Sequence, residues 1–139
     1  MSTSEQARQM IVTLGEQAKA AWVGTPIDIQ WDNRNLIDIT ARQTPYVDIC
    51  MMEMGGGQLE LGPKPLIKQD GYIVVTACIR EDQGSAKALA LRDHFLPYYE
   101  LKDLSVLRTY AGTAHKSVLA KGWMCYPVMI PFWFTRVAQ

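Results

Sequence analysis

Two stretches in the middle of the chain carry the clearest pattern of apolar positions, residues 46–54 and 72–79. In the first stretch Val47, Ile49 and Met51 alternate with other residues, which is the period of a half-buried strand. The second stretch is almost continuously apolar and β-branched, which is typical of a strand covered on both faces. We therefore expect these stretches to form the central antiparallel hairpin of the protein.

A single register accounts for the whole hairpin. If residue 54 lies opposite 72, then 46 lies opposite 80, and the same register continues to a turn at Gly62-Pro63-Lys64. Such strands exceed the usual ~5 to 6 residues, so the far end should overhang the body of the domain. Gly55-Gly56-Gly57 faces residues 69–71 and permits a bend or a bulge.

We interpret residues 58–68 as an arm that is hinged at this glycine waist and contacts a partner. The alternative is an ordinary surface loop with no partner, although loops longer than ~12 residues are uncommon without a function. The residues expected to form the interface are those of the waist and the tip: Gly55, Gly56, Gly57, Leu59, Leu61, Pro63, Leu66 and Ile67.

Helical spacing of apolar residues predicts two helices. The first begins after Ser4 as the N-cap and reaches about residue 22, and the second begins at residues 84–85 and is ended or kinked by Pro97. Further strands are expected at 104–110 and 123–134, and 111–121 is expected to be a loop whose internal structure the pattern does not define. Because Pro127 and Pro131 share a parity, the last strand is predicted to be an edge strand. Two short extended segments, 27–31 and 36–40, cannot be placed.

These elements indicate an α+β fold, in which two helices pack on an antiparallel sheet of about four strands with a long overhanging β-hairpin. The length predicts a single domain over residues 1–139. Fourteen basic and fourteen acidic residues cancel, which disfavours a nucleic-acid footprint or a polybasic membrane patch. The N-terminus does not resemble a signal peptide, and no apolar run approaches the ~18 residues of a membrane span, so we expect a cytoplasmic protein.

Residues capable of chemistry are few. Neither His94 nor His115 has a neighbour at metal-ligand spacing, and the chain contains no CxxC or HExxH motif. The glycine waist is not followed by the Lys-Ser/Thr of a phosphate loop. Cys50, Cys78 and Cys125 lie in apolar strand-like stretches and are expected to be free thiols, although a nucleophilic Cys50 or Cys78 remains open. We expect no enzyme activity, cofactor or metal.

Several segments, in this order along the chain, together resemble the tail terminator (tail completion) proteins of long-tailed bacteriophages. They are Pro26-Ile-Asp-Ile-Gln-Trp-Asp-Asn33, Pro45-Tyr-Val-Asp-Ile49, Leu61-Gly62, Gly71-Tyr-Ile-Val-Val75, Gly84 with Ala86, Ala90, Asp93 and Phe95, and Pro127-Val-Met-Ile-Pro-Phe132. The chain departs from the pattern at Arg92, at Pro97 and in its aromatic C-terminus.

The resemblance implies a structural virion protein that forms a homohexameric ring. Such a ring caps the tail tube, stops its polymerisation and presents a surface for head-tail joining, so its partners are the tail tube protein and the head-tail connector proteins. Genomic DNA would pass through the lumen without specific binding, and the protein would be found in the host cytoplasm during assembly and later in the virion. Two alternatives remain: another head-tail connector or tube component, and a small ligand-binding or enzymatic domain.

Overall fold

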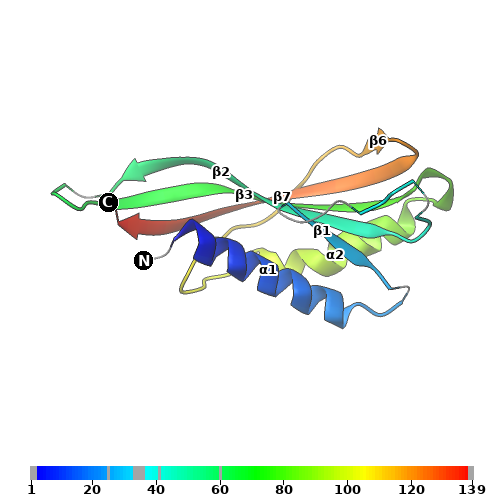
Figure 1. Ribbon diagram of the computed structural model, residues 1–139, viewed down its shortest axis with the longest axis horizontal. Helices are drawn as coiled ribbons and strands as arrows, with labels where there is room; N and C mark the ends of the chain where they lie inside the picture. The colour runs from blue at the N-terminus through cyan, green and yellow to red at the C-terminus, as the bar shows by residue number, and fades with distance from the viewer. Residues whose placement is uncertain (1–2, 25, 33–36, 41, 60, 138–139) are drawn as a thin grey trace.

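The computed structural model describes residues 3–24, 26–32, 37–40, 42–59 and 61–137, which form one sheet with both helices on the same face (Figure 1). The elements in chain order are α1 (Ser4–Ala21), β1 (Asp28–Trp31), β2 (Tyr46–Gln58), β3 (Leu66–Arg80), η1 (Glu81–Gln83), α2 (Ala86–Tyr99), β4 (Arg108–Thr109), β5 (Thr113–Ala114), β6 (Val118–Ala120) and β7 (Trp123–Val137).

The sheet has seven strands and is mixed, so the predicted four-stranded antiparallel sheet is wrong. Its order is β1-β2-β3-β7-β4, and β5 and β6 also pair with β7. β1 runs parallel to β2, with Asp28 opposite Tyr46 and Trp31 opposite Ile49. The alternation at 27–31 did signal a strand, but four residues carry no information about direction. Trp31 is buried beside Gly15 of α1, so packing between the helix and β1 fixes its place.

β7 was predicted to be an edge strand, and this is also wrong, because it pairs with β3 over its full length on one side and with three short strands on the other. The prolines explain why those outer strands are short. The carbonyl groups of Pro131 and Pro127 accept hydrogen bonds from the backbone N–H groups of Tyr110 and His115. In an antiparallel strand the N–H and C=O groups of one residue point to the same side. The backbone nitrogens of Pro127 and Pro131, which cannot donate a hydrogen bond, therefore face the short strands and not β3.

The helices cover one face of the sheet. α1 begins with a capping box in which Thr3, not the predicted Ser4, is the N-cap and exchanges hydrogen bonds with Gln6. Pro97 lies inside the last turn of α2, and the helix continues to Tyr99, whose hydroxyl donates to the Ile11 carbonyl at 2.7 Å. The core between the two layers contains buried residues of all three long strands and both helices: Ile11, Leu14, Val47, Ile49, Ile73, Val75, Leu91, Phe95, Ile130 and Phe132.

The central hairpin is present, but its register differs from the prediction. Tyr46 lies opposite Cys78 and Met52 opposite Tyr72, a shift of two residues, and a bulge then occurs between Glu53 and Gly55. A two-residue shift leaves every side chain on its expected face, so the alternation alone could not detect it. The bulge lies at the glycine waist, as expected.

A second, smaller core covers one end of the face that carries no helix. Tyr46, Cys78 and Trp123 are buried there against Ile37 and Ile39. The Trp123 indole N–H donates to the Ile39 carbonyl at 3.1 Å, and the Arg80 guanidinium donates to three carbonyls between residues 39 and 42. This chain segment is therefore held over the sheet by side chains of β3 and β7.

Candidate interface on the arm and the open face of the sheet

The arm extends past the helices as the continuation of the long strands (Figure 1). It has three strands along much of its length, because Leu66 pairs with Val137 and Lys68 with Thr135 of β7. On the other side Lys68 pairs with Gly57 of β2. Only the tip, residues 59–65, lies outside the strands; Glu60 within it falls outside the described residues. The arm is therefore a ribbon backed by β7 rather than a two-stranded hairpin.

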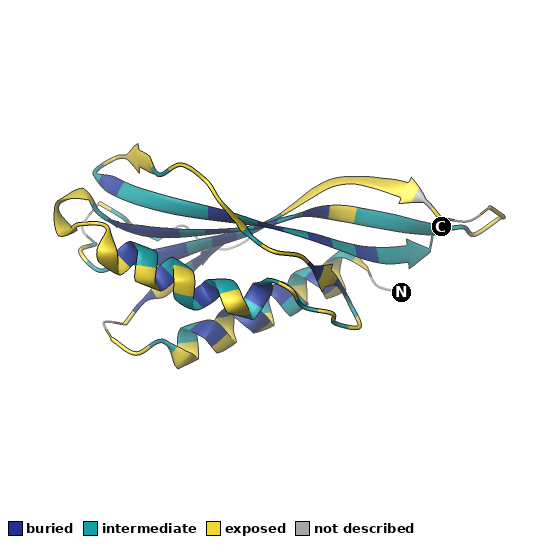
Figure 2. Ribbon diagram, turned by 180° about the vertical axis from the view of Figure 1, so that it is seen from behind, coloured by how far each residue is buried: buried dark blue, intermediate teal, exposed yellow. Residues whose placement is uncertain are grey.

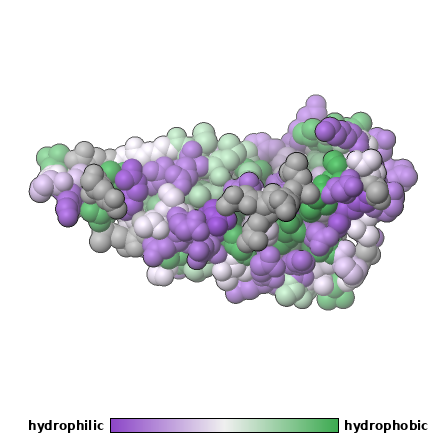
Figure 3. All heavy atoms as spheres, in the orientation of Figure 1, coloured by the Kyte–Doolittle hydropathy of each residue, from purple (hydrophilic) through white to green (hydrophobic). Residues whose placement is uncertain are grey.

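The predicted interface residues divide into two groups. Leu61 is 92% exposed and Leu59 is 53% exposed, and Pro63 is exposed between β2 and β3. Apolar atoms are visible at the left end of the molecule in Figure 3. Leu66 and Ile67, in contrast, are half-buried within β3. The two leucines of the tip therefore have little cover from the described part of their own chain.

At the waist, three glycines form the end of β2. Gly55, Gly56 and Gly57 are all exposed, and the Gln69 amide donates to the Gly55 carbonyl at 2.7 Å. Gly71 opposite them is buried, and a Cβ there would overlap the Met52 carbonyl. Gly71 thus allows the close approach of β2 and β3 at the bulge, and the glycine waist expected from the sequence has a structural basis in this one position.

Neither of the described helices covers the opposite face of the sheet, and its middle is lined largely by half-buried side chains (Figures 1 and 2). We call it the open face. Along each long strand the side chains point alternately to the core and to this open face, as the two-residue period of a strand requires. The residues of the open face are Asp48, Cys50 and Met52 of β2, Tyr72, Val74 and Thr76 of β3, and Pro127, Met129 and Pro131 of β7. Met52 is the most exposed, at 41%.

Asp48 is the charged residue of this surface. Burial raises the pKa of its carboxyl group above the usual value, and the nearby carboxylate of Asp32 adds to that increase. Among the described residues, no Lys or Arg forms an ion pair with Asp48. The Asp32 carboxylate itself accepts a hydrogen bond from the Met51 backbone N–H at 3.3 Å, where β1 no longer pairs with β2. A half-buried carboxylate without a cation is unfavourable and would be stabilised by one.

Trp133 marks the other end of the same face. Lys68 and Arg108 lie 5.1 Å and 5.4 Å from its ring centre, which is cation-π distance. Its indole N–H is buried and has no hydrogen-bond partner among the described residues. A hollow of about 290 Å³ lies beside it, with Tyr72 and Tyr110 in its lining. Tryptophan, tyrosine and arginine are the residues most enriched in protein interfaces.

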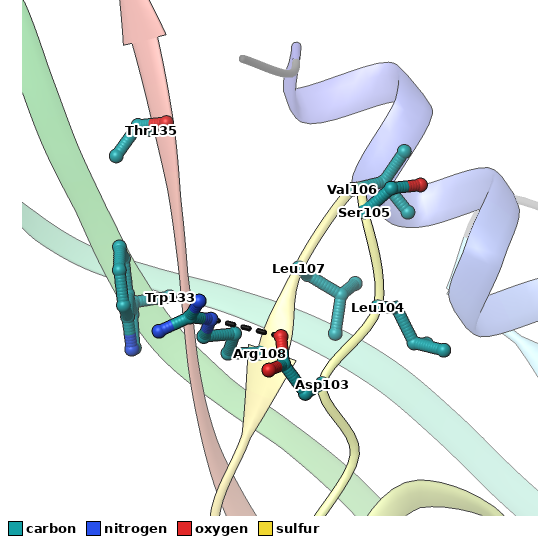
Figure 4. Close-up of a pocket in the computed structure, with 8 residues that line it drawn as sticks. All are labelled: Asp103, Leu104, Ser105, Val106, Leu107, Arg108, Trp133 and Thr135. Atoms are coloured by element: carbon teal, nitrogen blue, oxygen red, sulfur yellow. Dashed lines mark hydrogen bonds and ion pairs between the residues drawn. The ribbon is translucent and has the colours of Figure 1, made fainter.

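A second hollow, of about 340 Å³, lies on the other side of Trp133 (Figure 4). It is lined by residues 103–108 together with Trp133 and Thr135. Its two charged groups, Asp103 and Arg108, already form an ion pair at 2.9 Å. Neither a histidine nor a cysteine is among the described residues that line it, so its one carboxylate, Asp103, and its hydroxyl groups have no imidazole or thiol beside them in that lining.

The remaining candidates for chemistry are the cysteines and the histidines, of which Cys50 lies on the open face. Cys78 and Cys125 are paired across β3 and β7 and share a hydrogen bond, which raises the pKa of Cys78 and lowers that of Cys125. Burial raises the pKa of the Cys50 thiol. His94 contacts the Ala18 carbonyl at 2.7 Å between the helices, and His115 is exposed. In the part of the chain that the structure describes, no cluster of three His, Cys, Asp or Glu side chains could hold a metal ion.

The described helices include none that is long and apolar enough to cross a membrane. Comparison with known proteins adds the fold alone. No protein-family model matches the sequence, and no curated protein matches it either. Among solved structures, the chain is similar to a protein known only by a sequence code, with a TM-score of 0.63 and 12% identity over 95% of this chain and 98% of the other. This α+β arrangement therefore occurs in another protein over nearly its whole length.

Proposed function

We propose that this protein is a structural subunit of a phage tail, which forms a hexameric ring that caps the tail tube. The observation that carries the proposal is the arm, whose tip exposes Leu59 and Leu61 beyond the body of the domain. Two leucines at the end of a backed ribbon are costly in water and are covered when the subunit assembles. The proposal that this assembly is a tail terminator ring rests on the sequence segments that, in their order along the chain, resemble tail terminator proteins.

The ring acts as a stop. By covering the last ring of the tail tube protein it removes the surface to which another tube subunit would add, and its other side receives the head-tail connector proteins. Contacts between unlike surfaces of identical subunits close into a ring when the rotation between neighbours allows it. Catalysis has no part in this function, and DNA passes through the lumen without specific contacts.

The test is the assembly state of the purified full chain, measured by light scattering and negative-stain electron microscopy. Discrete six-membered rings that stop the growth of tubes of the tail tube protein support the proposal. Long tubes formed by the chain alone would identify a tube component instead, and a monomer that never joins tubes would contradict both.

A shortened arm provides the matched variant. Residues 60–65 are replaced by Asn-Gly, which connects Leu59 to Leu66 through a two-residue turn, since these two residues are already hydrogen-bonded at 2.7 Å. The domain should fold, yet tubes should grow to uncontrolled length. In hydrogen exchange, residues 59–65 of the wild type should become protected on assembly, whereas β3, paired on both sides, is protected throughout.

Measurement of DNA binding independently tests whether the lumen of the ring is a passive channel. With fourteen basic and fourteen acidic residues, the chain should bind duplex DNA weakly and lose that binding as salt rises. Tight, sequence-specific binding at physiological salt would refute a passive channel.

A further inference from the structure

Two surfaces of this chain lack cover and complement each other. One is the tip of the arm, with exposed Leu59 and Leu61 and the exposed cation of Lys64. The other is the open face, which is largely apolar and carries the Asp48 carboxylate. We infer that the tip of the arm docks on the open face of a neighbouring copy, with the leucines against Cys50, Val74 and Met129 and with Lys64 opposite Asp48.

This inference rests on the proposed function, because it names the surface through which neighbouring subunits of the ring contact each other. The charges of Lys64 and Asp48 favour the arm of a second copy as the partner of the open face. Among the described residues neither Lys64 nor Asp48 forms an ion pair within its own chain. Asp48 is half-buried and has the Asp32 carboxylate nearby, and a carboxylate in such a place gains most from a cation brought by the partner.

The arm cannot reach the open face of its own subunit. Lys64 is twelve residues along the chain from Thr76, the residue opposite Asp48, and eleven of the residues 65–76 belong to β3. At ~3.3 Å per residue, the strand from Leu66 to Thr76 holds the base of the tip roughly 33 Å from the position opposite Asp48. β3 is paired with β7 throughout, so it cannot fold back without breaking that pairing. The contact must therefore join two copies.

The donor and receiver surfaces are different parts of the chain, so a copy can give its arm to one neighbour and receive the arm of another. Such a heterologous contact produces a closed ring or an open filament according to the rotation between copies. Two copies that exchanged arms reciprocally would form a symmetric dimer instead, and cross-linking would then stop at the dimer.

Cross-linking tests the placement, because the open face contains a native thiol. Leu61→Cys should cross-link to Cys50 of the neighbouring copy when a short bis-maleimide is added to the assembled protein, giving dimers and a ladder up to the closed ring. Val23→Cys is the control, since Val23 is 91% exposed and lies outside both surfaces. The L61C cross-link must disappear when Cys50→Ser is added. A cross-link that persists without Cys50, or one as strong from Val23→Cys, would overturn the inference.

Charge reversal tests the ion pair. Asp48→Lys and Lys64→Asp should each raise the concentration needed for assembly by roughly tenfold or more, as for other desolvated interface charges, and the double variant should restore assembly. Circular dichroism checks the fold, and Lys64→Asp alone remains informative if Asp48→Lys fails to fold, because Lys64 is exposed.

The two proposals fail differently. If the shortened arm prevents ring formation while Lys64→Asp leaves it unchanged and L61C does not cross-link to Cys50, the ring function stands and the docking surface is wrong. If the wild type never forms rings, the proposed function fails and this inference with it.

Discussion

Gly71→Ala should destabilise the protein severely, because a side chain at Gly71 would meet the backbone of β2 beside its bulge. A Cβ at this residue would overlap the carbonyl oxygen of Met52, and would lie 2.9 Å from its carbonyl carbon and 3.0 Å from the Cα of Glu53. All three are backbone atoms, so no side-chain rotation relieves the contact. The strands must separate at the waist or the bulge must move.

The cost of this change is at the upper end of what overpacking produces, about 3 kcal/mol. A domain of this size is stable by only about 5–15 kcal/mol, and the loss corresponds to a decrease of roughly 10 °C in Tm. Gly57→Ala is the matched control, because a Cβ there meets nothing within 4 Å. It should change the free energy of unfolding by less than about 1 kcal/mol, and in the stabilising direction.

Urea denaturation followed by circular dichroism measures both variants, and hydrogen exchange locates the effect. In Gly71→Ala the exchange of residues 50–58 and 66–74 should rise, while α1 stays protected. Equal free energies of unfolding for the two variants would refute the reasoning, because the backbone contact at the bulge would then carry no cost.

Three further outcomes are expected. Thr3→Ala should lower the free energy of unfolding by about 1 kcal/mol through loss of the capping box, and Ser4→Ala should have little effect; equal losses in thermal melts would argue against Thr3 as the N-cap. Trp123→Phe should cost about 1 kcal/mol more than Trp133→Phe in urea melts, because only the first removes a hydrogen bond, the one from the Trp123 indole N–H to the Ile39 carbonyl, which Arg80 continues to contact. The second removes a donor that has no partner among the described residues. Asp48→Asn should raise the Tm of the free subunit at pH 7 but not near pH 3. Burial raises the carboxyl pKa, so the wild type gains the associated stability only below the unfolded pKa and loses it as pH rises through the folded one; a gain that grows on acidification would contradict this sign.

The pattern of apolar positions predicted the elements that bury a face over many residues. Both helices and the three long strands were expected near their observed places, because 3.6-residue and two-residue periods repeat several times within them. The register of the hairpin was not predictable in the same way. A shift of two residues conserves the faces, and the choice between registers depends on backbone contacts such as the one at Gly71.

Short strands account for most of the remaining errors. β4 and β5 have two residues each and β6 has three, too few for a period, and each of them pairs with β7. The segment 104–110 was predicted to be a strand, but only Arg108–Thr109 pairs with β7. The exposed tip of the arm was predictable from its turn residues and its length. The open face was not predictable, because the alternation of residues in β2 does not indicate which of its two faces the helices cover.

The backing of the arm by β7 has a mechanical consequence. A flexible tether fixes only the distance between two bodies, whereas a stiff beam also fixes the angle between them. Because β2, β3 and β7 share backbone hydrogen bonds from the body into the arm, a load on the tip is transmitted along the strands to the layer of helices. In a circular assembly the angle between neighbours determines how many copies close the circle. The stiffness of this beam would therefore set the number of subunits, and an added residue in one strand that altered its twist would change the count before it weakened the contact.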